Sequence, residues 1–63
     1  MNDYTALAEK IVSSELFNAA VALMDDDLRE AVHAEFAPCE DAEFLARYME
    51  AHNEKYGADF IIN

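Results

Sequence analysis

The side chains of this 63-residue sequence that could do chemistry are two histidines, one cysteine and fourteen carboxylates. His33, Cys39 and His52 could act as zinc ligands, but none has a second His or Cys at the spacing that zinc sites use. The apolar stripe around His52 instead predicts a half-buried packing residue. Cys39 as a nucleophile would need an activated thiolate, which the adjacent carboxylates of Glu40 and Asp41 oppose. We therefore predict no metal, no cofactor and no enzymatic activity.

Three consecutive aspartates, Asp25, Asp26 and Asp27, form the densest acidic cluster. An EF-hand calcium loop needs alternating acidic residues, a central glycine and a distal glutamate, and this stretch lacks that pattern. Carboxylates are also favoured in the first turn of a helix, where they meet the positive end of the helix dipole. Asp27 followed by Glu30 resembles a capping box. We interpret the cluster as the start of a helix.

The formal net charge is −10, from fourteen acidic and four basic residues. Residues 25–54 alone hold ten of the acidic residues and two of the basic ones, a local balance of −8. Such a charge argues against direct binding to nucleic acid or to anionic membranes, since phosphates are bound by Lys and Arg. It favours a basic protein surface as the partner. The alternative is that the charge serves only solubility.

Two pairs of acidic residues, Asp26 with Glu30 and Glu50 with Glu54, are spaced to lie on one helix face. Side chains at this spacing lie about 5–6 Å apart, so their repulsion destabilises the isolated helix. Negative charge repeated in this way could occupy a groove that normally binds a nucleic-acid backbone. Tyr48 is a further candidate for contact with a partner, since tyrosine is enriched at interface hot spots. The alternative is that its side chain is buried in the core. The predicted partner-binding residues are Asp25, Asp26, Asp27, Glu30, Glu40, Asp41, Glu43, Glu50, Glu54 and Tyr48.

Length and composition predict one small domain over residues 1–63. The hydrophobic fraction is 54%, but twelve of these residues are alanines, so the core is expected to be modest and a homodimer is left open. A single cysteine excludes an internal disulfide. No signal peptide is apparent, and no apolar run approaches the roughly 18 residues that span a bilayer. We expect a soluble, cytoplasmic protein.

The elements that position these residues are predicted to be helices. The sequence has one Gly and one Pro, and each lies where a helix is expected to end. Apolar residues follow helical spacing through residues 4–24, interrupted at Ser13 and Ser14. Because no Gly or Pro forces a break, we predict one helix there, with two shorter helices as the alternative. A second helix is predicted over about 27–36, closed by Pro38.

The last predicted helix begins after Cys39, with acidic residues in its first turn, and ends at Gly57 as a left-handed cap. The apolar residues after it predict a short extended tail that covers the helices or pairs with another chain as an edge strand. The expected fold class is all-α, a compact bundle of three to four short helices with this tail.

The stretch from Asp25 to Tyr48 (DDDLREAVHAEFAPCEDAEFLARY) resembles sequences of short proteins from bacterial mobile elements and phages. The likeness spans about half of the chain and continues weakly into His52, Lys55 to Gly57 and Phe60. Small acidic proteins of such elements include anti-CRISPR and antirestriction proteins, some of which imitate DNA. These inhibitors share no common motif, so the resemblance assigns no role to any residue.

Together these observations predict an acidic, protein-binding inhibitor from a phage or mobile element. It would block a basic nucleic-acid-binding surface of a host defence protein such as a CRISPR effector or nuclease. The alternative is a helical adaptor or dimerisation module that binds through an apolar face made by Tyr48, Met49, Phe60 and Ile61.

Overall fold

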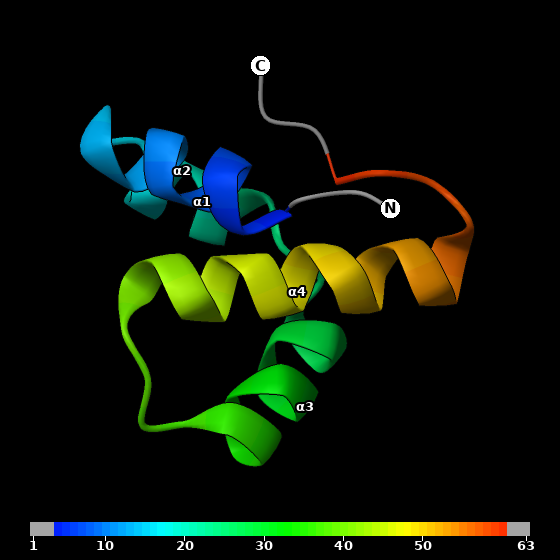
Figure 1. The fold of residues 1–63 in the computed structure, drawn as a ribbon. Coiled ribbons are helices and arrows are strands. Elements are labelled where there is room, and N and C mark those ends of the chain that lie inside the picture. The colour runs from blue at the N-terminus through cyan, green and yellow to red at the C-terminus, as the bar shows by residue number, and fades with distance from the viewer. Residues whose placement is uncertain (1–3, 61–63) are drawn as a thin grey trace.

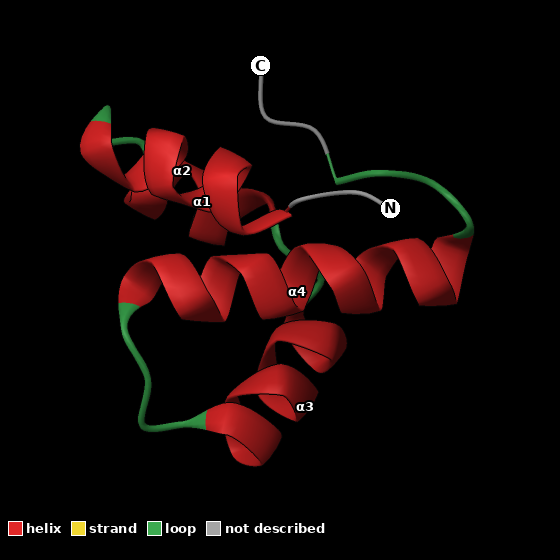
Figure 2. Cartoon of the chain, in the orientation of Figure 1, coloured by secondary structure: helices red, strands yellow, loops and turns green. Residues whose placement is uncertain are grey.

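A computed structural model describes residues 4–60, and within them the chain forms four helices and no strand. The helices are α1 (Tyr4–Ser13), α2 (Phe17–Leu23), α3 (Asp26–Phe36) and α4 (Asp41–Tyr56). Helix α4 runs through the middle, with α1 packed along one side and α3 crossing the other (Figure 1). Short loops connect the helices (Figure 2). The all-α prediction is confirmed. Within the described part, no helix is long and apolar enough to cross a membrane.

The prediction of one helix over residues 4–24 is wrong, because the chain turns sharply at Glu15. This residue has a φ of 60°, in the left-handed region. The N–H of Glu15 donates to the carbonyl of Val12, and the N–H of Leu16 donates to the carbonyl of Ile11. These two bonds form a Schellman motif, in which glycine usually occupies the left-handed position. The motif ends α1 and redirects the chain into α2.

The ends of α3 and α4 follow the predicted signals in part. Helix α3 begins one residue earlier than expected, with Asp25 as its N-cap and no side-chain capping bond, so the capping box at Asp27 is wrong. Helix α4 has Asp41 and Glu43 in its first turn and ends at Gly57. Gly57 has a φ of 68°, and its N–H donates to the carbonyl of Asn53. The predicted left-handed cap is confirmed.

The core is centred on α4, which contributes the largest fully buried side chains, Leu45, Tyr48 and Met49. Each of the other helices contributes a buried residue to this core, and α1 and α2 do so with alanines, Ala8 and Ala20. Small side chains let helix backbones approach closely, so the alanine-rich composition suits this packing. Consequently most large apolar side chains of α1 and α2 are only half-buried or exposed.

The described part of the C-terminal tail folds back over α4. Phe60 is buried and packs edge-on against the Tyr48 ring, with ring centroids 4.9 Å apart. Asp59 accepts hydrogen bonds from the Tyr4 hydroxyl and the Asn53 amide, each 3.0 Å long. Covering of the helices is therefore confirmed as far as Phe60, while the residues after it lie outside the described part.

Candidate functional site

The predicted carboxylates lie at the surface. Asp25 is half-buried, and the other eight are exposed. Tyr48 differs, because its side chain is fully buried and cannot contact a partner directly. Its place among the partner-binding residues is therefore a correction, and the alternative of core burial holds. The apolar face proposed for the adaptor is likewise corrected, since Met49 and Phe60 are also buried and Ile61 lies outside the described residues.

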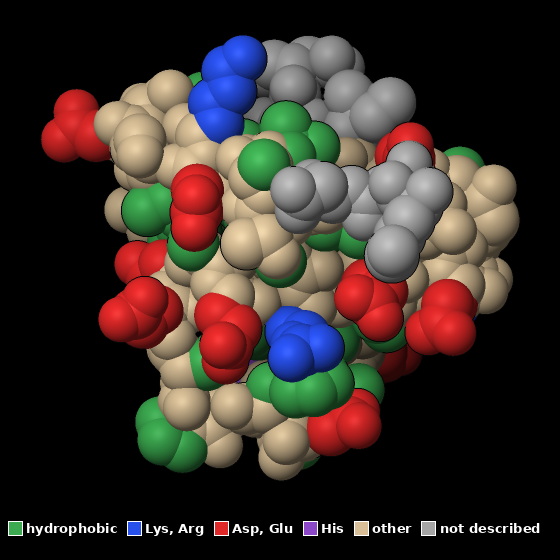
Figure 3. All heavy atoms as spheres, in the orientation of Figure 1, with side chains coloured by type: hydrophobic (Ala, Val, Ile, Leu, Met, Phe, Trp, Pro, Cys, Tyr) green, Lys and Arg blue, Asp and Glu red, His purple; other side chains and the backbone are tan. Residues whose placement is uncertain are grey.

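Acidic side chains are spread widely across the face of the molecule on which α4 and α3 lie (Figure 3). They do not gather in one patch, and few basic side chains lie among them in this view. Such a surface presents an extended negative potential that attracts basic partners from a distance.

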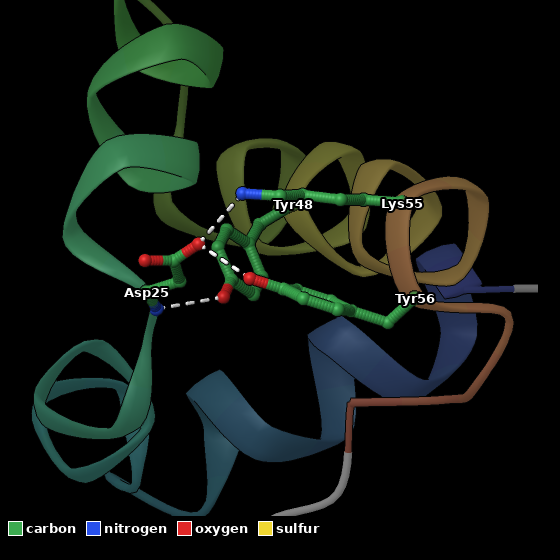
Figure 4. Close-up of polar contacts among 4 residues, drawn as sticks. All are labelled: Asp25, Tyr48, Lys55 and Tyr56. Atoms are coloured by element: carbon green, nitrogen blue, oxygen red, sulfur yellow. Dashed lines mark hydrogen bonds and ion pairs between the residues drawn. The ribbon is translucent and has the colours of Figure 1, made fainter.

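The exception among the carboxylates is Asp25, which joins the start of α3 to the end of α4. Its carboxylate oxygen Oδ2 accepts hydrogen bonds from the Tyr56 hydroxyl at 2.7 Å and from Lys55 Nζ at 3.0 Å. Its backbone N–H donates to the Tyr48 hydroxyl oxygen at 2.9 Å. Figure 4 shows these three side chains of α4 converging on Asp25 at the junction of α2 and α3. We call these four residues the Asp25 cluster.

Electrostatics within the Asp25 cluster favour its ionised form. The hydrogen bond from Tyr56 and that from Lys55 hold the pKa of Asp25 below its usual value of 3.8. The hydrogen bond to Asp25 raises the pKa of Lys55 above 10.5. Burial raises the pKa of Tyr48 above 10.0, because the phenolate is poorly solvated there. Asp25 is therefore held within the molecule by three side chains of α4.

Three of the four basic residues are engaged within the molecule. Arg29 pairs with Asp26 at 3.2 Å, and Lys55 pairs with Asp25. The guanidinium of Arg47 lies over the Phe36 ring, 4.8 Å from its centroid, in a cation–π contact. These contacts neutralise two carboxylates and leave most of the acidic residues unpaired among residues 4–60.

Two grooves bring together acidic residues that are distant in the sequence. The large groove, about 1000 Å³, lies among α2, α3, the 37–39 connection and the start of α4, and its lining includes Glu30 and Asp41. The small groove, about 330 Å³, lies between α3 and α4, and its lining includes Glu35, Glu50 and Glu54. Asp26, Asp27, Glu40 and Glu43 line neither groove.

The residues considered for metal binding are not assembled into a site. No group of three or more His, Cys, Asp or Glu side chains within residues 4–60 is arranged to hold a metal ion. His52 is half-buried, as predicted, and packs against the rings of Tyr48 and Phe60. His33 and Cys39 both line the large groove, and the His33 ring lies edge-on to Phe44.

Sequence reasoning missed two sets of residues. Lys55 and Tyr56 bind Asp25 from 30 and 31 residues away in the sequence, and no local pattern indicates that contact. Phe17 and Val21 follow the helical apolar spacing of residues 4–24 and pack against the core, but they are only half-buried and also line the large groove. In both cases the decisive contacts join different helices, so no local pattern could reveal them.

The fold and the surface define a small all-α protein on which acidic side chains far outnumber basic ones. The family model described as anti-CRISPR protein AcrIC5 matches residues 8–60. The chain therefore belongs to the AcrIC5 anti-CRISPR family, and it is an anti-CRISPR inhibitor whose binding partner is a CRISPR–Cas component. Comparisons with curated proteins and with solved structures found no match.

Proposed function

We propose that this protein inhibits CRISPR–Cas immunity by covering a basic, nucleic-acid-binding surface of an effector component. The observation that carries the proposal is the exposure of eight of the nine predicted carboxylates on a chain with a net charge of −10. Family membership supplies the class of target, and the charge supplies the mode of recognition. The protein acts in the cytoplasm of the bacterial host, where the effector is found.

The binding mode follows from the chemistry of the effector. Any protein that holds a guide RNA or a target DNA does so with lysine and arginine side chains along the phosphates. A rigid protein that presents carboxylates at close spacing competes for the same cations. Glu50 and Glu54 are both exposed and lie one turn apart on α4. Pairs of this kind are suited to two neighbouring cations of a nucleic-acid channel.

The test is charge reversal with a matched control. Glu50→Lys combined with Glu54→Lys alters the surface of α4, whereas Glu9→Lys combined with Glu15→Lys alters the exposed surface of α1 and the turn after it. Both variants change the net charge by the same amount. We expect the α4 variant to lose most of its affinity for the effector and the control to lose much less. Competition between the protein and target DNA should be measured with both variants.

Equal losses in the two variants would mean that overall charge, not the α4 surface, drives binding. Retention of affinity by a folded α4 variant would overturn the proposal. A third informative result would be a complex in which the effector still binds its nucleic acid normally, since that excludes coverage of the nucleic-acid-binding surface.

A further inference from the structure

The large groove has an apolar floor built from two helices. Phe17 and Val21 come from α2 and Phe44 from α4, and the rings of Phe17 and Phe44 meet edge-on with centroids 6.5 Å apart. Ala37 and Pro38 complete one wall. Both phenylalanines and Val21 are half-buried, so the fold leaves part of their surface exposed to water. An apolar depression of this size is large enough for a bulky side chain of another molecule.

The rim of the large groove is acidic. Glu30 on α3 and Asp41 at the start of α4 are exposed, and neither forms an ion pair within residues 4–60. The one lysine or arginine in the lining, Arg29, is paired with Asp26 at 3.2 Å. The groove therefore combines apolar surface at its base with uncompensated negative charge at its edge.

The apolar base and the acidic edge together restrict which molecules could bind in the large groove. A second copy of the chain would bring another ten negative charges against an acidic rim, which opposes association. Nucleic acid is disfavoured for the same reason. A protein segment with an apolar side chain flanked by lysine or arginine satisfies both features, and surfaces that bind nucleic acid are rich in such cations.

We propose that the large groove is the anchoring site for the CRISPR–Cas target, and that it holds a short basic segment by one aromatic or branched aliphatic side chain. That side chain packs on Phe17, Val21 and Phe44, while neighbouring lysines or arginines meet Glu30 and Asp41. The inference rests on the proposed function and deepens it. The carboxylates steer the encounter, and the groove supplies the contact that persists when salt screens the charges.

Cys39 provides a direct probe, because it is the single cysteine of the chain, is partly exposed and lines the large groove. The experiment measures its alkylation by iodoacetamide with and without the purified CRISPR effector complex that this protein inhibits in cells. Occupation of the groove should slow alkylation by at least about tenfold, since the reaction needs an accessible thiolate. A complex that forms with unchanged alkylation would overturn the inference and leave the proposed function intact.

A second measurement places a bulky group in the large groove. Modification of Cys39 with N-ethylmaleimide should weaken effector binding about thirtyfold, the loss typical of removing one interface anchor. The control carries the same adduct on α2 outside the groove, in a chain with Cys39→Ser and Leu23→Cys, and should bind normally, since Leu23 is 57% exposed and does not line the groove. Circular dichroism confirms that both adducts fold.

The remaining outcomes also decide the question. Protection of Cys39 that appears on raising the concentration of the protein alone would mean that a second copy fills the large groove, and would overturn the inference. Failure of the unmodified protein to form any complex with an effector would overturn the proposed function and the inference together. Normal binding by the Cys39 adduct would overturn the inference alone.

Discussion

The hydroxyl of Tyr48 accepts a 2.9 Å hydrogen bond from the backbone N–H of Asp25, across twenty-three residues of sequence. Tyr48 is fully buried in the middle of α4, and Asp25 is the N-cap of α3. The bond therefore sets where α3 begins relative to the central helix. The Asp25 carboxylate then binds Lys55 and Tyr56 further along α4, so one residue is held to the same helix at both its backbone and its side chain.

Substitution Tyr48→Phe should reduce the free energy of unfolding by about 1–3 kcal/mol, because it leaves the partly buried N–H of Asp25 without an acceptor. Urea unfolding followed by circular dichroism measures the change. Tyr56→Phe is the control, since it removes the same atom from a side chain that is 51% exposed, and it should cost less. Equal losses in the two variants would show that the bond from Asp25 to Tyr48 stabilises the fold no more than the exposed bond of Tyr56 does.

The Asp25 cluster predicts an acid dependence of stability. The pKa of Asp25 is lowered in the folded state, so its stabilising contribution is present above pH 3.8 and is lost as the pH falls through the folded-state pKa. We expect the stability difference between the wild-type protein and Asp25→Asn to be largest near neutral pH and to shrink as the pH falls below 3.8. Comparing the two proteins cancels the relief of overall charge repulsion in acid. A difference that is constant with pH would contradict this account.

Substitution Glu15→Gly should stabilise the protein by about 1 kcal/mol, because glycine adopts the left-handed conformation without the steric cost of a Cβ. Glu15→Ala is the matched control, since it removes the same charge and keeps the Cβ. The difference in unfolding free energy between the two variants isolates the backbone effect. Equal stabilities would show that the turn after α1 relaxes in solution.

Salt should affect folding and binding in opposite directions. The molecule is about 25 Å across and has a net charge of −10, so its carboxylates repel one another over a Debye length of about 10 Å at 0.1 M salt. Raising sodium chloride towards 1 M should therefore raise the unfolding midpoint while weakening the complex with the effector. Thermal unfolding and binding titrations at matched salt concentrations measure both. Affinity that rises with salt would exclude an electrostatic encounter.

Several features could be predicted from local sequence. Helix α4 could be predicted from its two ends. Asp41 and Glu43 in its first turn and Lys55 in its last turn have the charges that the helix dipole favours, and Gly57 favours the left-handed conformation of the C-cap. Pro38 likewise marked the end of α3. The break after α1 could not be predicted, because Glu15 takes a left-handed conformation that glycine normally adopts. The turn is defined by the backbone hydrogen bonds of Glu15 and Leu16 to Val12 and Ile11.

The sequence by itself determined the all-α class, the excess of negative charge and the resemblance to small acidic anti-CRISPR proteins, because helical periodicity, composition and sequence likeness do not depend on which helices contact one another. Only the tertiary structure decided that Tyr48 is internal, that Asp25 binds α4, and that Phe17, Val21 and Phe44 form the floor of an acidic-rimmed groove. Those outcomes depend on how helices far apart in the chain cross one another, and that crossing is set by the packing of their whole surfaces.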